Sequence, residues 1–184
     1  MKLDAEFARP PSFATKRLRI RPMKLTDAEA LFEFKSDGEV TRHYGQEPKS
    51  MGELRTWVRG RVAGRKRHDS IFWVFTPKGD DTAIGSCCFW NFDPSFNSAE
   101  IGYELHPAHW GKGIMTEALP PILAYGFAGL GLHRIEACPL ADNEPSKRLL
   151  LKLGFNYEGN LRQRVLFRGR HLDQLYYGLL KEDQ

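Results

Sequence analysis

The chain has 184 residues, of which 41% are hydrophobic and 27% are charged, and its formal net charge is +4. This length suits one domain with a single core, and the composition excludes a largely disordered chain. A net charge this small does not by itself indicate a nucleic-acid-binding protein. The N-terminal residues include acidic side chains and prolines where a signal peptide has an apolar run, and no later segment offers ~20 consecutive apolar residues. We therefore expect a cytoplasmic protein that makes no membrane contact.

In the first half of the chain, the residue pattern predicts a strand, two helices and a pair of strands. Residues 17–23 alternate apolar and basic side chains, which is the period of a half-buried strand. A first helix is expected to begin with Thr26 as its N-cap, and a second to run from Ser50 to Lys66. Residues 70–92 form two apolar runs around a Pro-Lys-Gly-Asp turn, which is typical of two adjacent strands.

The second half predicts further strands and helices. The expected elements are a strand at 98–107, a helix after Gly113, a strand at 133–140, a helix at 143–153, and strands at 155–167 and 173–180. Because proline lacks a backbone donor, we expect the strand at 133–140 to end or bulge at Pro139 and to part from its neighbour there. The order β-α-α-β-β-β-α-β-α-β-β predicts an α/β (α+β) domain, in which helices pack on a mixed sheet.

Basic residues gather in the second predicted helix and just after it: Arg55, Arg59, Arg61, Arg65, Lys66, Arg67 and His68. Two interpretations stay open. The run is the solvated face of an amphipathic helix, or it is a surface for an acidic partner such as ribosomal RNA.

A glycine-rich segment, "HPAHWGKGIMTEAL" from His106 to Leu119, joins the strand at 98–107 to the helix that follows. Glycine is favoured where the backbone has a positive φ or where another group approaches it closely. The first turn of a helix has free N–H groups and the positive end of the helix dipole. Gly111 and Gly113 therefore indicate an anion site at this helix start, although G-x-G alone is a weakly specific pattern.

Several further motifs occur in the order found in one known family: "TKRLRIRPMKLTDAEALF", "AEIGYELHPAHWGKGIMTEAL", "LGLHRIEA", "NEPSKRLLLKLGFNYEG" and "GRHLDQLYYGLL". On these motifs the chain resembles the GCN5-related N-acetyltransferases (the GNAT superfamily), and among them the RimJ/RimL type, from about Thr15 to Leu180. The resemblance implies a GNAT fold, with a central mixed, mostly antiparallel sheet, a splayed strand pair and helices on both faces. It divides the chain into an N-terminal extension at 1–14 and an acetyltransferase domain at 15–184.

The resemblance also implies the reaction. An acetyl group passes from acetyl-CoA to a primary amine in a ternary complex, without a covalent enzyme intermediate and without a metal. The acceptor is a small-molecule amine or a protein N-terminal α-amine, such as that of a ribosomal protein, and the enzyme is a monomer or a homodimer. Two alternatives remain open: a catalytically weak acyl-CoA-binding sensor, and a ribosome- or RNA-associated module that uses the basic run.

The resemblance places CoA contacts on the glycine-rich loop, the preceding strand and the next helix start. Backbone N–H groups from Ala108 to Gly113, together with the helix dipole, would hold the CoA pyrophosphate. The family pattern usually has Gln or Arg at the position of Ala108. The expected CoA-binding residues are Tyr103, Leu105, Ala108, Trp110, Gly111, Lys112, Gly113, Ile114, Met115, Asn143 and Lys147.

The catalytic candidates are two carboxylates and a serine. Alternation along the strand puts Glu100 and Glu104 on one face, and at ~3.4 Å per residue they stand about 14 Å apart, too far to act as an acid/base pair. Glu100 is the first candidate for the base that removes the amine proton, and Glu104 is the second; for either, the alternative is an exposed strand carboxylate that forms a salt bridge. By resemblance, Ser146 gives a proton to the leaving CoA thiolate. The alternative for Ser146 is a structural role in a helix cap with Asn143.

The resemblance places the acceptor site at the two N-terminal helices and the loop between them. His43, Tyr44, Trp57 and Trp90 are candidates to line that site, with ordinary core positions as the alternative. RimL-type enzymes have a glutamate where this chain has Val165, so the ribosomal-protein activity does not transfer directly to this chain.

Overall fold

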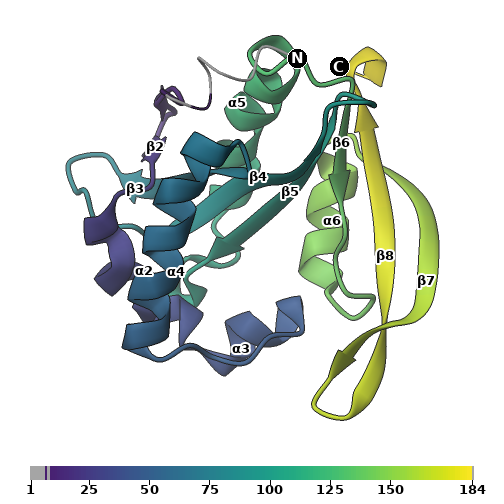
Figure 1. The fold of residues 1–184 in the computed structure, drawn as a ribbon, viewed down its shortest axis with the longest axis horizontal. Coiled ribbons are helices and arrows are strands. Elements are labelled where there is room, and N and C mark those ends of the chain that lie inside the picture. The colour runs from purple at the N-terminus through teal and green to yellow at the C-terminus, as the bar shows by residue number, and fades with distance from the viewer. Residues whose placement is uncertain (1–6, 8, 184) are drawn as a thin grey trace.

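Eight strands form one sheet in a computed structural model that describes residue 7 and residues 9–183. In chain order they are β1 (Phe13–Ala14), β2 (Leu18–Pro22), β3 (Ser70–Pro77), β4 (Gly85–Asp93), β5 (Ser98–Leu105), β6 (Arg134–Ala137), β7 (Asn156–Phe167) and β8 (Arg170–Leu180). Across the sheet the order is β1-β2-β3-β4-β5-β6-β8-β7 (Figure 1). Neighbouring strands are antiparallel except β5 and β6, which are parallel. The predicted mixed, mostly antiparallel sheet is confirmed.

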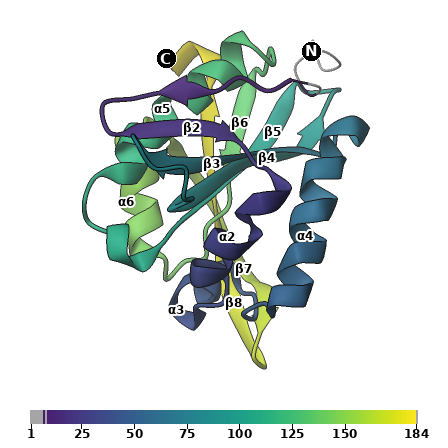
Figure 2. The ribbon, with the colours of Figure 1, turned by 90° about the vertical axis from the view of Figure 1, so that its left-hand side faces the viewer.

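Helices cover both faces of the sheet (Figure 2). They are α2 (Ala28–Lys35), α3 (Gly38–Thr41), α4 (Met51–Gly64), α5 (Ile114–Ala128) and α6 (Glu144–Lys152). Helices α2 and α4 form a core with Phe72 and Val74 of β3, whereas α5 and α6 form a second core with Trp73 and Phe75. Strand β3 serves both cores because successive side chains of a strand point to opposite faces. Within the described part of the chain, no helix is both long enough and apolar enough to cross a membrane.

Two helix starts differ in how well the sequence predicts them. Helix α4 begins after Ser50 as expected, with a capping box in which the Glu53 carboxylate accepts the Ser50 N–H at 2.8 Å. Helix α2 begins at Ala28, and the predicted N-cap Thr26 is wrong because Thr26 lies inside a 3-10 turn at Leu25–Asp27. The sequence also gave no sign of β1 and α3, which are too short to show a period.

Part of the predicted N-terminal extension packs on the domain. Strand β1 pairs with β2, and the side chain of Phe7 is fully buried in the core on the α5 side. The boundary between the extension and the domain at residue 15 stays a prediction. Phe7 and Phe13, which precede it, pack into the core on the α5 side of the domain.

Strands β5 and β6 part soon after they begin to pair. Their register ends at the pair Glu100 and Glu136. Strand β6 ends at Ala137, and the chain beyond Pro139 crosses to β8, where Leu140 forms an isolated bridge. The predicted end of this strand is confirmed, although pairing with β5 stops at Glu136 and the strand ends at Ala137, before Pro139 itself. Figure 1 shows β8 and β7 as a long hairpin that diverges from β5.

Strand β7 forms one edge of the sheet, and most of its side chains are exposed. Its register with β8 shifts twice, between Tyr157 and Gly159 and between Leu161 and Val165. In the second shift Gln163 has a φ of 56°, a left-handed conformation that is uncommon for a residue with a side chain. The two shifts are β-bulges, which bend and twist a strand.

Candidate active site

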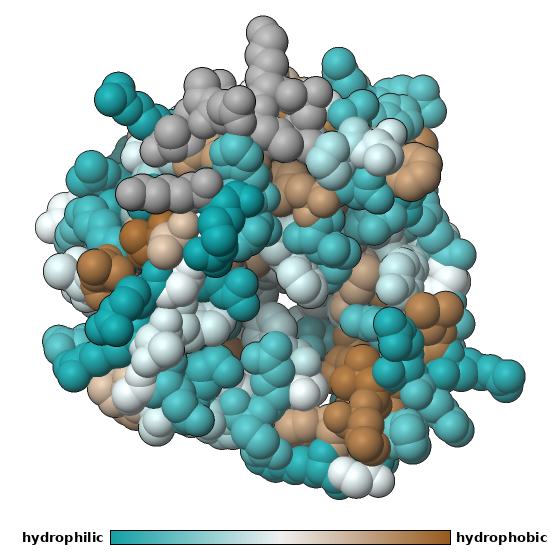
Figure 3. Space-filling model, viewed as in Figure 1, coloured by the Kyte–Doolittle hydropathy of each residue, from teal (hydrophilic) through white to brown (hydrophobic). Residues whose placement is uncertain are grey.

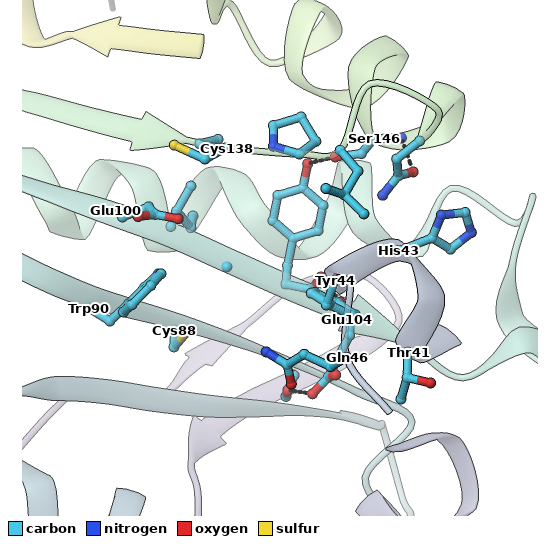
Figure 4. Close-up of a pocket in the computed structure, with 18 of the residues that line it drawn as sticks. Thr41, His43, Tyr44, Gln46, Cys88, Trp90, Glu100, Glu104, Cys138 and Ser146 are labelled. Atoms are coloured by element: carbon cyan, nitrogen blue, oxygen red, sulfur yellow. Dashed lines mark hydrogen bonds between the residues drawn. The ribbon is translucent and has the colours of Figure 1, made fainter. Parts of the chain in front are cut away.

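A cavity of about 350 Å³ extends from the α4 side of the sheet into the opening between β5 and β6. Figure 3 shows the molecule hollowed on this face, and Figure 4 shows side chains of β4, β5 and the start of α6 facing the cavity. The predicted acceptor-site residues His43, Tyr44, Trp57 and Trp90 all line it, and so does Val165. The same cavity contains both catalytic candidates of β5 and the serine of α6.

Glu100 is the last residue of β5 that pairs with β6, and its partner in the register is Glu136. Burial and the nearby Glu136 carboxylate both disfavour the ionised form, and together they raise the pKa of Glu100 to about 7. Arg134 holds Glu136, with its Nε donating to the carboxylate at 2.8 Å, and also pairs with Glu158. Arg134 thus fixes the Glu136 carboxylate beside Glu100, and Glu100 lines the cavity with a carboxyl group whose pKa is near neutral.

Glu104, the second candidate, is engaged in structural contacts. Its carboxylate accepts a hydrogen bond from Ser86 Oγ at 2.6 Å and forms an ion pair with the Lys35 ammonium. The side chain is only 8% exposed, and the Lys35 side chain is 12% exposed. The two carboxylates do share one face of β5, as the alternation predicts, but they occupy different environments.

Tyr103 and Ser146 connect β5 to α6 across the opening. Their hydroxyl groups are 2.7 Å apart, and either can donate (Figure 4). The backbone of Ser146, and not its side chain, takes part in the helix cap, because its N–H donates to Asn143 Oδ1 at 3.1 Å. Ser146 thus does take part in the cap through its N–H, while its hydroxyl bonds to Tyr103.

Two predicted CoA contacts of α6 have partners of their own. Asn143 is the N-cap of the helix. The ammonium of Lys147 donates to the Ala141 carbonyl at 3.0 Å and pairs with Glu144. A phosphate contact by Lys147 stays a prediction, and it would have to compete with these partners.

The glycine-rich loop leaves a run of backbone donors free. Gly111 and Gly113 have φ values of +72° and +70°, and a side chain at residue 111 would meet no atom of the protein within 4 Å. The N–H groups of residues 108–110 bond within their own turn, where the Ala108 N–H donates to His106 Nδ1 at 3.1 Å. Among the described residues, the N–H groups at 111–116 have no acceptor. The free donors thus begin at Gly111, later than predicted, and they suit a phosphate group.

Contacts at both ends of the loop fix its position. The Trp110 indole N–H donates to the Leu105 carbonyl at 2.8 Å, which ties the loop to the end of β5. Arg17 donates to the Lys112 carbonyl at 2.9 Å and pairs with Glu117 of α5 at 2.6 Å. Hydrogen bonds from Thr15 and Arg17 lower the pKa of Glu117 to about 2, so this brace stays ionised. Sequence reasoning missed the brace because its partners are about a hundred residues apart.

A second contact missed from the sequence covers the opening. The Tyr44 hydroxyl donates to the Tyr103 carbonyl of β5. Tyr44 follows α3, so the segment between α2 and α4 reaches the strand edge that the parting of β5 and β6 exposes. The acceptor-site loop and the exposed edge of β5 are therefore in direct contact.

Sequence comparisons agree with this architecture. A family model for the acetyltransferase (GNAT) domain matches residues 17–156. The uncharacterized N-acetyltransferase YoaA of Bacillus subtilis is 38% identical over 172 residues, which cover 93% of this chain and 97% of YoaA. The ribosomal-protein-serine acetyltransferase of Escherichia coli is 29% identical over 137 residues, which cover 74% of this chain and 75% of that protein.

A solved structure supports the same assignment. The acetyltransferase (GNAT family) from Bacillus anthracis superimposes with a TM-score of 0.83 at 27% identity, covering 94% of this chain and 99% of that one. The matched family model extends over most of the chain, and the sheet has the splayed strand pair that the motifs imply. The protein therefore belongs to the GNAT family of N-acetyltransferases, among its RimJ/RimL-like members.

Proposed function

We propose that this enzyme transfers the acetyl group of acetyl-CoA directly to a primary amine bound in the cavity. The observation that carries the proposal is the position of Glu100, a half-buried carboxyl group at the point where β5 loses its strand partner, with a pKa raised to about 7. The loop with free N–H groups follows the same strand. One strand thus connects an anion site to a titratable carboxyl group.

In this proposal the loop and β5 bind CoA, which supplies the activated acetyl group. The free N–H groups at 111–116 and the positive end of the α5 dipole bind the pyrophosphate. The edge of β5 beyond Glu100 lies open to the extended pantetheine arm, which would have to displace the Tyr44 hydroxyl to reach the Tyr103 carbonyl. Arg17 positions the loop through the Lys112 carbonyl.

Glu100 takes the proton of the acceptor. A primary amine is mostly protonated at neutral pH, and it must lose a proton before or during attack. A carboxylate with a pKa near 7 suits this step better than one with an ordinary pKa, because catalytic bases work best near the operating pH. Glu104 is not the base in this proposal, since Lys35 and Ser86 engage its carboxylate.

The hydroxyl pair of Tyr103 and Ser146 returns a proton to the sulfur of the departing CoA. Burial raises the pKa of Tyr103 well above its usual value, so the phenol keeps its proton at neutral pH. The hydrogen bond between the two hydroxyls allows either to donate toward the opening. Ser146 lines the cavity beside β5, which suits this role.

Ser146→Ala should lower kcat by about tenfold to a hundredfold, because a thiolate leaves fairly well even without a proton and water can replace the donor. Its melting temperature should stay close to that of the wild type, since the helix cap uses the Ser146 N–H and not the hydroxyl. Tyr103→Phe should have a similar effect, and the double variant should lose no more than the stronger single variant, because the two hydroxyls act as one unit. Single-turnover acetyl transfer and thermal melting on the same preparations give both quantities. If Ser146→Ala and Tyr103→Phe both transfer the acetyl group at the wild-type rate, the two hydroxyls do not act as proton donors.

The experiment that tests the proposed function is a screen of amines and ribosomal proteins with acetyl-CoA. We expect CoA thiol release that depends on the added amine, and a product heavier by one acetyl group in mass spectrometry. Binding of CoA without acetylation of any amine, peptide or ribosomal protein would contradict the proposal and favour the sensor alternative.

A further inference from the structure

Arg61 of α4 lines the cavity without an acidic partner. Its guanidinium carbon lies 5.5 Å from the centroid of the Trp57 ring and 5.6 Å from that of Phe72. Other arginines of the basic run pair with carboxylates outside the cavity, Arg55 with Glu29 at 3.3 Å for example. No ion pair or hydrogen bond of Arg61 occurs within the described part of the chain. Two aromatic faces therefore hold a guanidinium whose N–H groups are free.

The other charges of the cavity are mostly neutralised. The charged side chains that line it, apart from the histidine, are Lys35, Lys49, Arg61, Glu47, Glu100 and Glu104. Glu104 pairs with Lys35, and Glu47 pairs with Arg168 at 2.7 Å. Glu100, Lys49 and Arg61 remain, and they have no ion-pair partner among the residues described here. Lys49 precedes the first residue of α4, whereas Arg61 lies in its last turn, so the two cations stand at opposite ends of the helix.

The strand register gives the separation of Arg61 from the proposed base. Phe72 pairs with Cys88 on the next strand, and Cys88 pairs with Gly102 on the strand after that. At ~4.8 Å per strand, Phe72 and Gly102 are about 10 Å apart. Glu100 is two residues from Gly102 on the same face of β5, and Arg61 stacks on Phe72. The Cα atoms of Phe72 and Glu100 are thus on the order of 12 Å apart, so the guanidinium beside Phe72 and the Glu100 carboxyl group line different parts of the same cavity.

We propose that the natural acceptor carries a carboxylate that binds Arg61 while its amine lies at Glu100. The inference rests on the proposed function, because it assigns the amine to the same cavity. A guanidinium presents paired N–H donors in one plane and binds a carboxylate with two hydrogen bonds. The contacts with the Trp57 and Phe72 rings hold the guanidinium at the cavity wall before the acceptor arrives. The acceptor class is an amine with a carboxylate at the other end of a spacer, either a free ω-amino acid or a peptide with an acidic residue near its N-terminus.

The first arm of the test compares kcat/KM for ω-amino carboxylates of increasing chain length with alkylamines of the same length. A second arm compares amidated peptides that carry Glu or Gln near the N-terminus, which distinguishes the two sources of the carboxylate. In the wild type we expect a preference for the carboxylate of roughly 10- to 100-fold, the usual size for a hydrogen bond to a charged group. The preference should be largest at one chain length, because the two subsites are fixed in the fold.

Arg61→Gln should remove the preference, mainly by raising KM for the carboxylate acceptors, and Arg61→Lys should keep part of it. Arg55→Gln makes the same charge change on the same helix outside the cavity, and it should keep the full preference. Equal rates for charged and neutral amines in the wild type would overturn the proposal. So would a preference that survives in Arg61→Gln and is lost in Lys49→Gln.

A binding measurement separates this inference from the proposed function. An N-acetylated ω-amino carboxylate, the expected product, should raise the melting temperature of the CoA complex in the wild type and not in Arg61→Gln. The CoA-induced shift alone should be the same in both proteins, which shows that Arg61→Gln is folded. If no amine is acetylated but this difference in binding is found, the carboxylate site stands and the proposed function fails. If amines are acetylated and the difference is absent, the carboxylate site fails alone.

Discussion

Glu100→Gln should lower kcat at neutral pH by ~10²–10⁴-fold, the range of a direct general base. The amide cannot accept the amine proton, but it has the size of the carboxyl group and leaves the free N–H groups at 111–116 unchanged. The CoA-induced rise in melting temperature should therefore stay intact. Raising the pH should partly restore the rate, because more of the acceptor then arrives as the free amine. Steady-state kinetics and a thermal shift with CoA measure the two effects.

The pH profile gives an independent check through Glu136. Since Glu100 must be ionised to act as a base, and its pKa is raised to about 7, kcat/KM should fall as the pH decreases below 7. Glu136→Gln removes the like charge beside Glu100, which lowers the pKa of Glu100 and moves this fall to a lower pH. The same acceptor must be used for both proteins, so that the titration of the amine cancels. An unmoved profile in Glu136→Gln would contradict the assignment.

Glu104→Gln is the matched variant on the same strand face. It leaves the Lys35 ammonium without its carboxylate in a largely buried site, so its main effect should be a lower melting temperature. A fully active Glu100→Gln together with a folded but inactive Glu104→Gln would show that the base is Glu104.

Gly111→Val should abolish the thermal shift with CoA. Valine is strained at a φ of +72°, and its branched side chain would stand in the open space where the phosphate approaches the free N–H groups. At a CoA concentration 100-fold above Kd, the wild type should gain ~2.7 kcal/mol of stability, which is easily measured. Lys112→Ala should only weaken the shift, because it leaves the backbone donors in place. NAD and ATP should not stabilise the wild-type protein to this extent.

Gly79→Val controls for backbone strain. Gly79 has a φ of +89°, and a side chain there would also meet nothing within 4 Å, but it lies in the turn between β3 and β4 and not in the glycine-rich loop. Both variants should lose similar stability without CoA, and only Gly79→Val should keep the CoA-induced shift. Loss of the shift in both variants would trace the effect to general destabilisation and not to the loop.

The sequence predicted those parts of the fold that carry a period or a strong local signal. The alternation in residues 99–105 placed Glu100 and Glu104 on one face, and Pro139 signalled the end of β6, which stops two residues before it. Strand β1 and helix α3 were missed because a few residues show no period. The cap at Thr26 was wrong because Asp27 competes for the same turn, accepting from the Lys24 N–H at 2.7 Å.

The site was predictable where it depends on a continuous motif and not where it depends on distant contacts. Gly111 and Gly113 are neighbours in the chain, so a local pattern indicated the loop. Lys35 pairs with Glu104, and Arg17 holds the loop through the Lys112 carbonyl. Both contacts depend on how distant parts of the chain pack together, which no local pattern shows. The same is true of Arg61. In the sequence it is one basic residue in a run, and only the docking of α4 on β3 turns it toward the cavity.

The two bulges of β7 affect how readily this edge of the sheet can pair with a strand of another molecule. A long, straight strand at the edge of a sheet presents a row of free backbone groups that can recruit a strand from another molecule. Strand β7 also exposes apolar side chains, Leu161 and Leu166 among them, which would favour such recruitment. The bulges interrupt this row twice, and the second interruption contains the exposed, charged residues Arg162 and Arg164. The β7 edge is therefore a poor template for adding strands from other molecules.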